Sequence, residues 1–94
     1  MANRASILDA VNIAVRNTNE TLPAESRIGP SESERILGEG AKIDSLGFVT
    51  LMVAVEQEVE AAFGQCPSLA EELSDPAAGV TTIGQLIDYL AERV

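Results

Sequence analysis

The chain has 94 residues, enough for one domain with a single hydrophobic core and too few for two. Fifteen acidic and six basic residues give a net charge of −9, which argues against nucleic acid or an anionic membrane surface as partners, because phosphate contacts need Lys and Arg. The charge favours partner proteins with basic patches, and the apolar content of 46% with only two Phe, one Tyr and no Trp predicts an aliphatic core.

The first predicted element is a helix that follows an N-cap at Asn3 or Ser6. Its apolar residues recur at helical spacing, and they are Ile7, Val11, Ala14 and Val15. Residues 17–19 are poor helix-interior residues, so the helix is expected to fade there.

A long connection over residues 20–44 comes next, with two Pro, three Gly and no strand pattern. Loops of this length are uncommon in compact domains and are often functional. We expect Ile36, Leu37 and Ile43 to anchor it in the core.

The second helix gives the strongest pattern and runs from about Ser45 to Phe63, with Gly64 as its stop. At about 100° per residue, one face collects the predicted core residues, which are Phe48, Leu51, Met52, Val55, Val59 and Ala62. The opposite side carries an apolar strip of Leu46, Val49 and Val53 where a monomer needs polar residues. Either the long loop covers this strip, or the strip docks partners and is rimmed by Glu56 and Glu60.

Two shorter helices complete the chain. One is predicted around Ser68–Ser74, before Asp75-Pro76 ends it. The last begins at Thr82, which forms a capping box with Gln85, and its apolar face is Ile83, Leu86, Ile87 and Leu90. The expected fold is therefore an all-α four-helix bundle, with three main helices and one short helix, in a single domain over residues 1–94.

Ser45 is the candidate residue for chemistry, because it stands at the start of the second helix. Free backbone N–H groups and the positive end of the helix dipole favour a phosphate there. The chain has no His that could activate the hydroxyl, which disfavours a hydrolase and a His-ligated metal centre. Its single cysteine allows neither an internal disulfide nor a Cys-rich metal centre. Ser45 therefore suits modification by another protein, and the alternative is that Ser45 or Asp44 merely caps the helix.

The stretch Ile43-Asp44-Ser45-Leu46-Gly47-Phe48-Val49, followed by Leu51, Val55-Glu56 and Phe63-Gly64, resembles the acyl carrier protein family. The family pattern is an Asp-Ser-Leu that opens the second helix, a Val four residues after the Ser and a Glu eleven residues after it. Thr81-Thr82-Ile83 and Leu86–Leu90 resemble the family's last helix. The resemblance covers the whole chain.

The resemblance implies that a phosphopantetheinyl transferase attaches a 4′-phosphopantetheine arm from coenzyme A to Ser45. The arm's thiol would hold an acyl group as a thioester, and acyl-loading and acyl-processing enzymes with basic docking patches would do the chemistry. Leu46 and Val53 match the family's apolar recognition positions and Glu56 an acidic one, and we expect Asp44, Val49 and Glu60 to contact partners too. The protein itself would be no enzyme.

Departures from the family pattern favour a specialised pathway, such as that of a polyketide or modified lipid, over housekeeping fatty-acid synthesis. The positions of Thr50 and Gln57 are commonly acidic in fatty-acid carriers, and residues 65–79 form a longer segment. A peptidyl, aminoacyl or aryl carrier and an unmodified acidic interaction module are the alternatives. The N-terminus lacks a signal-peptide pattern and the apolar run 46–55 is too short to span a bilayer, so we expect a cytoplasmic monomer.

Overall fold

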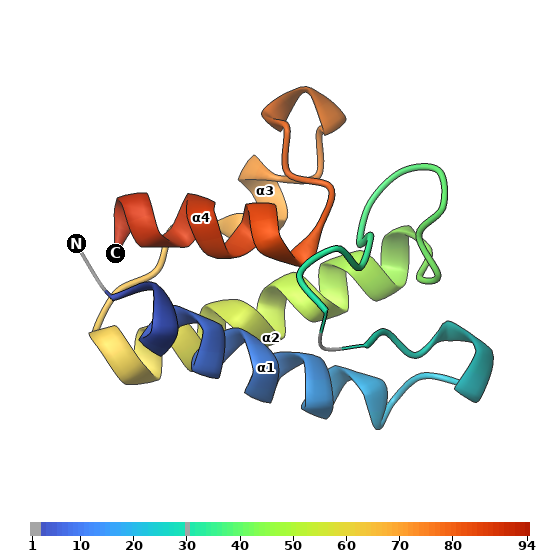
Figure 1. Cartoon of the computed structure of the whole chain (residues 1–94), viewed down its shortest axis with the longest axis horizontal. Helices are drawn as coiled ribbons and strands as arrows, with labels where there is room; N and C mark the ends of the chain where they lie inside the picture. Colours follow the sequence, from blue (N-terminus) through green and yellow to red (C-terminus); the bar gives the residue numbers. More distant parts are fainter. Residues whose placement is uncertain (1–2, 30) are drawn as a thin grey trace.

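A computed structural model describes residues 3–29 and 31–94 of the chain; Met1, Ala2 and the predicted loop residue Pro30 lie outside them. The elements, in chain order, are α1 (Arg4–Asn19), a 3₁₀ turn η1 (Ala24–Ser26), α2 (Ser45–Phe63), α3 (Leu69–Glu72), a 3₁₀ turn η2 (Pro76–Ala78) and α4 (Ile83–Arg93) (Figure 1). No strand occurs in the described ranges, where the only β pairing is an isolated bridge between Arg35 and Thr82. The expected all-α bundle of three main helices and one short helix is confirmed.

The helices end where local capping chemistry sets their limits. Asn3 caps α1 by accepting a hydrogen bond from the Ala5 backbone N–H at 2.7 Å. Thr82 and Gln85 form the predicted capping box at α4, and Gly64 ends α2 in a left-handed conformation with φ 81°. Helix α3 is shorter than predicted, because it begins at Leu69 and its C-cap is already Leu73.

The core forms between α1 and α2, which run antiparallel side by side, with α4 packed against α1 (Figure 1). The four predicted apolar residues of α4 are fully buried, as are most of those on α2. Ala62 is the exception, and the prediction that it faces the core is wrong. Ala61 and Ala62 are both exposed, while Phe63 in the same turn is half-buried and packs against the core.

The long loop is fastened to the bundle by buried side chains and by backbone pairing. Ile36 and Ile43 are buried as expected, but Leu37 is only half-buried, and Ile28 is a further buried anchor that has no helical periodicity to reveal it. Three backbone hydrogen bonds pair the loop with the start of α4, from Ile36 N to Thr81 O (2.8 Å), from Ile83 N to Glu34 O (3.0 Å) and from Gly84 N to Glu32 O (2.8 Å). The loop carbonyls thus accept from N–H groups that the first turn of α4 leaves unpaired.

Glycine at position 84 makes this pairing possible. A Cβ atom there would lie 3.1 Å from the Glu32 carbonyl oxygen, which is closer than most real contacts of this kind. Arg4 adds an exposed clamp on the same side, since its guanidinium contacts Glu32 at 2.5 Å and Asp88 at 2.7 Å. Contacts with α4 therefore fix the path of the loop that leads into α2.

Candidate functional site

At the start of α2, one residue caps the helix and the next residue is the candidate modification site. Asp44 is the N-cap residue, and its Oδ1 accepts a hydrogen bond from Gly47 N at 2.8 Å. Ser45 is the first helical residue and is exposed, and its hydroxyl makes no hydrogen bond within residues 3–29 and 31–94. Of the two capping alternatives, Asp44 is therefore the cap, and the Ser45 hydroxyl does not cap the helix.

The backbone around Ser45 suits an attached phosphodiester. Within the described part of the chain, the N–H groups of Ser45 and Leu46 have no hydrogen-bond acceptor, while those of Gly47 and Phe48 bond to Asp44. Unpaired N–H groups at a helix N-terminus stabilise negative charge. An exposed hydroxyl with these neighbours fits 4′-phosphopantetheine attachment.

The position of Gly47 in the first turn of α2 leaves little room for a side chain, since a Cβ there would lie 3.0 Å from the Ile43 Cβ.

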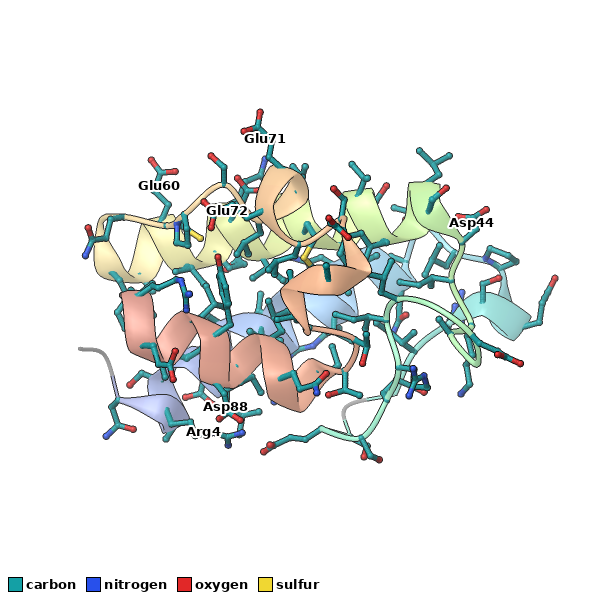
Figure 2. All side chains as sticks on the ribbon, turned by 90° about the horizontal axis from the view of Figure 1, so that it is seen from above. Arg4, Asp44, Glu60, Glu71, Glu72 and Asp88 are labelled. Atoms are coloured by element: carbon teal, nitrogen blue, oxygen red, sulfur yellow. The ribbon has the colours of Figure 1, made fainter. Side chains whose placement is uncertain are left out.

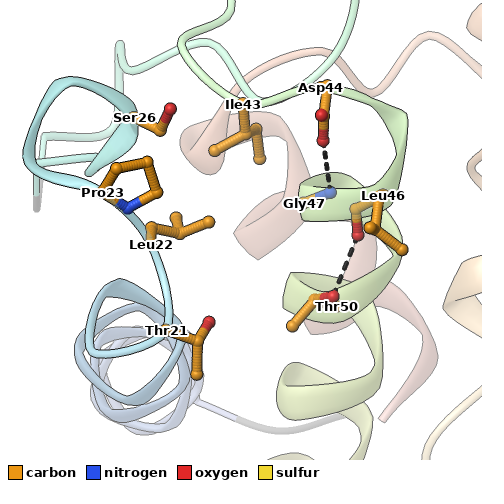
Figure 3. Close-up of a pocket in the computed structure, with 9 residues that line it drawn as sticks. All are labelled: Thr21, Leu22, Pro23, Ser26, Ile43, Asp44, Leu46, Gly47 and Thr50. Atoms are coloured by element: carbon orange, nitrogen blue, oxygen red, sulfur yellow. Dashed lines mark hydrogen bonds between the residues drawn. The ribbon is translucent and has the colours of Figure 1, made fainter.

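A hollow of about 260 Å³ lies beside this helix start, between α2 and the segment that follows α1 (Figure 3). Its apolar lining comes from Leu22, Pro23, Ile43 and Leu46, and its polar lining from Thr21, Ser26, Asp44 and Thr50, with Gly47 at its edge. Sequence reasoning missed this hollow, because six of its nine lining residues belong to the loop over residues 20–44, which has no periodic pattern.

The apolar strip on α2 is exposed to solvent, and the long loop does not cover it. Leu46 is 74% exposed, Val49 40% and Val53 43%. The core residue Val55, only two positions after Val53, is fully buried. Of the two alternatives, cover by the long loop is therefore wrong, and docking of partners on the strip stays a prediction. The exposed strip begins next to Ser45.

The two predicted acidic rim residues lie in different surroundings. Glu60 is exposed, and Figure 2 shows it with Glu71 and Glu72 near α3, while Asp44 lies at the other end of α2. Glu56 is half-buried, and its Oε2 accepts a hydrogen bond from the Ala70 backbone N–H at 3.3 Å. Glu56 therefore holds α3 against α2 as well as contributing negative charge.

The single cysteine is not part of this site. Cys66 is half-buried in the segment between α2 and α3. Burial, reinforced by the negative charges of Glu56 and Glu60, raises the pKa of the Cys66 thiol to about 11. The thiol is therefore protonated at neutral pH and is a poor nucleophile.

Further findings delimit the site. Among residues 3–29 and 31–94, no three His, Cys, Asp or Glu side chains are grouped so that they could hold a metal ion. Within the same ranges, none of the helices combines the length and apolar character needed to cross a membrane. Models of protein families, curated proteins and solved structures were compared with the chain, and none of them matches it.

Proposed function

We propose that this protein is a discrete carrier protein of the acyl carrier type, with a 4′-phosphopantetheine arm on Ser45. The observation that carries the proposal is an exposed serine hydroxyl at the first position of α2 with no hydrogen bond in the described part of the chain. It lies beside unpaired backbone N–H groups and next to the exposed apolar strip Leu46, Val49 and Val53. An attachment point and a docking surface on one helix are what a shuttled carrier requires.

The modification itself is the work of a phosphopantetheinyl transferase with coenzyme A as donor. The Ser45 oxygen forms a bond to the phosphorus that carries pantetheine, the pyrophosphate bond breaks, adenosine 3′,5′-bisphosphate leaves, and a base of the transferase takes the hydroxyl proton. This chain contains no His, the commonest base for a serine hydroxyl, and Asp44 Oδ1 beside Ser45 is engaged by Gly47 N. The unpaired Ser45 and Leu46 N–H groups at the N-terminus of α2 would stabilise the negative charge of the phosphodiester.

When bound, the arm supplies a terminal thiol that carries an acyl group as a thioester. The residues of this chain bind and orient the protein on its partners: the apolar strip is desolvated in the contact, and Asp44, Glu56 and Glu60 attract basic patches. We propose that the carrier acts as a cytoplasmic monomer in a specialised pathway, which is what the residues at positions 50 and 57 favour. A peptidyl, aminoacyl or aryl carrier would differ from it in the kind of cargo that the thioester holds.

An unmodified interaction module is the second candidate function. The same strip supports it, because an exposed apolar surface on an acidic helix docks partners whether or not Ser45 is modified. Modification of Ser45 separates the two candidates.

The test is incubation of the full chain with coenzyme A and a promiscuous phosphopantetheinyl transferase, followed by intact mass measurement. We expect the mass of one phosphopantetheinyl group to be added to the wild type and nothing to be added to Ser45→Ala. The variant keeps its fold, because Asp44 is the cap and an exposed substitution changes stability by no more than about 0.5 kcal/mol. Circular dichroism checks the fold.

Ser68→Ala is the matched control, since Ser68 is also an exposed serine at the start of a helix and makes no capping hydrogen bond. This variant is expected to be modified as well as the wild type. A wild-type chain that stays unmodified would favour the interaction module, and labelling that persists in Ser45→Ala would move the site to another residue.

A further inference from the structure

A second cleft, of about 210 Å³, lies between the C-terminal half of α1 and the loop segment that turns back along it (Figure 1). We call it the α1 cleft, and it is lined by Asn12, Val15, Arg16 and Asn19 of α1 and by Ile28 of the loop. The Asn19 side chain joins the two walls, because Ile28 N donates to its Oδ1 at 2.9 Å and its Nδ2 donates to Ile28 O at 2.7 Å. None of these residues lines the hollow at the start of α2, so the α1 cleft is a separate site.

The α1 wall of this cleft carries a hydrogen-bond acceptor without a partner. Asn12 Oδ1 is buried and accepts no hydrogen bond from any described residue. A buried acceptor without a donor lowers the stability of a fold, and a ligand that donates to it removes that cost. Within the described part of the chain no hydrogen bond holds the Asn12 Nδ2 either, so the amide can turn about χ2 towards a ligand.

The α1 cleft is positively charged, although the protein has a net charge of −9. Arg16 is exposed and forms no ion pair among the described residues, not even with Glu20 one turn further along. No acidic residue lines the cleft. The Arg27 guanidinium adds positive charge nearby, since its Nε donates to the Asn19 carbonyl at 3.1 Å. A guanidinium pairs with a carboxylate through two parallel hydrogen bonds, so the cleft favours a carboxylate ligand.

The size of the cleft and its remaining lining define the rest of the ligand. Val15 and Ile28 supply apolar walls, and at about 30 Å³ for each water-sized group the cleft has room for about seven non-hydrogen atoms. The donor to Asn12 is not an ammonium, because an ammonium has three protons to satisfy and Asn12 Oδ1 is the one acceptor without a donor among the described lining residues. A hydroxyl is the smallest donor that fits.

We propose that the α1 cleft binds a small aliphatic 2-hydroxy acid, whose carboxylate pairs with Arg16 and whose hydroxyl donates to Asn12. These residues are four positions apart on one face of α1, with about 5–6 Å between their Cβ atoms, which suits polar groups on neighbouring carbon atoms. The alkyl chain lies against Val15 and Ile28.

Two further points define the source of the carboxylate and the scope of the site. The net charge of −9 repels an acidic protein surface over a long range, whereas a small monoanion meets mainly the local charge of Arg16. The ligand is therefore a free small molecule. The site does not include Ser45, and the proposal stands whether or not Ser45 is modified.

The first experiment compares 2-hydroxybutanoate, which fills this volume, with two probes of the same shape. 2-Methylbutanoate has a methyl group in place of the hydroxyl, and 2-hydroxybutanamide has a neutral amide in place of the carboxylate. Each is titrated into the full isotope-labelled chain at one ionic strength, and the backbone amide signals of Asn12, Arg16 and Ile28 are followed. We expect both analogues to bind about tenfold more weakly than 2-hydroxybutanoate. Equal affinities, or no binding of 2-hydroxybutanoate, would overturn the proposal.

A pair of charge-matched variants tests the role of Arg16. Arg16→Gln and Arg35→Gln remove the same charge from two exposed arginines, of which only Arg16 lines the cleft. Neither change is expected to alter the melting temperature appreciably. We expect Arg16→Gln to weaken binding of 2-hydroxybutanoate about tenfold and Arg35→Gln to bind it like the wild type. Equal weakening in both variants would show general charge attraction and overturn the proposal.

Asn12→Leu tests the unpaired acceptor, because it keeps the approximate shape of the side chain and removes the polar atoms. We expect the melting temperature to rise, since a buried acceptor without a donor is replaced by an apolar group. The variant should also bind 2-hydroxybutanoate no more tightly than 2-methylbutanoate. A variant that still prefers 2-hydroxybutanoate, or one that melts at a lower temperature, would show that Asn12 Oδ1 is not the acceptor for the ligand and would overturn the proposal.

Discussion

Glu34 joins two distant parts of the long loop through one carboxylate oxygen. Its Oε1 accepts a hydrogen bond from the Gly29 backbone N–H at 2.7 Å and contacts Lys42 Nζ at 3.3 Å. The hydrogen bond from Gly29, supported by the charge of Lys42, holds the pKa of Glu34 below its ordinary value of 4.5 in spite of partial burial. The carboxylate is therefore favoured by the folded state.

The lowered pKa of Glu34 predicts how stability depends on pH. Between the folded pKa and the ordinary value of 4.5, the unfolded chain binds more protons, so the stabilisation present above pH 4.5 is lost as pH falls through the folded pKa. Glu34→Gln keeps an acceptor for Gly29 but does not ionise. We expect it to cost about 1 kcal/mol at neutral pH and to make the melting temperature fall less steeply in acid. Glu39→Gln, an exposed change in the same loop, should reproduce the wild-type profile in thermal melts.

Glu56 is predicted to matter for structure as well as for docking. Ser68, the N-cap of α3, makes no side-chain capping bond, and Glu56 supplies the acceptor for Ala70 N instead. Glu56→Lys removes that acceptor and places a cation at a helix N-terminus, so we expect a loss of about 1–2 kcal/mol in urea unfolding. Hydrogen exchange of the α3 amides should accelerate with it.

Glu60→Lys is the control for Glu56, because the Glu60 side chain is exposed and makes no hydrogen bond among the described residues. Both charge reversals should slow association with a basic partner, with an effect that shrinks as salt rises. Only Glu56→Lys should destabilise the fold. If Glu60→Lys is equally destabilising, the cap on α3 is not the cause.

At the scale of the element, α2 has a buried face and an exposed apolar strip that begin within one turn of each other. Val53→Asp is expected to change stability by no more than about 0.5 kcal/mol, because Val53 is 43% exposed. Partner-dependent modification of Ser45 should slow in the same variant, because docking would bury an unpaired charge. Thermal unfolding and the rate of transferase labelling measure the two effects.

Val55→Asp provides the opposite case on the same helix. Val55 is fully buried, and a carboxylate placed there loses its hydration without gaining a partner. We expect this variant to be unfolded at room temperature. Equal destabilisation by Val53→Asp would mean that the strip is packed in solution, contrary to its exposure in the structure.

At the scale of the whole molecule, we expect charge repulsion to outweigh the surface ion pairs. Arg4 lies in exposed pairs with Glu32 and Asp88, with side chains between 43% and 66% exposed, and such pairs contribute little. The net charge of −9 on a small surface opposes compaction. We therefore expect the melting temperature at neutral pH to rise with NaCl over the range in which the Debye length falls from about 30 Å to about 8 Å. A melting temperature that falls with salt would show that the ion pairs dominate.

The sequence by itself determined the features that depend on neighbouring residues. The bounds of α2 at Ser45 and Phe63 and the capping box of α4 follow from periodicity, caps and a stop glycine. Periodicity placed the apolar strip on the far side of α2 but left open whether the long loop covers it. These patterns act within one or two helical turns, so they can be read without knowing what packs on them. Ser45 could be singled out for the same reason, since its place at a helix start is local.

The tertiary structure decided what depends on contacts between distant segments. Ala62 shares the core periodicity yet is exposed, while its neighbour Phe63 packs against the core. Ile28 is buried without any pattern, because the loop is pinned to α4. Glu56 reaches α3, and the hollow forms only where the segment after α1 meets the start of α2. Burial and cavities are properties of several segments at once, and the periodicity of one segment does not contain them.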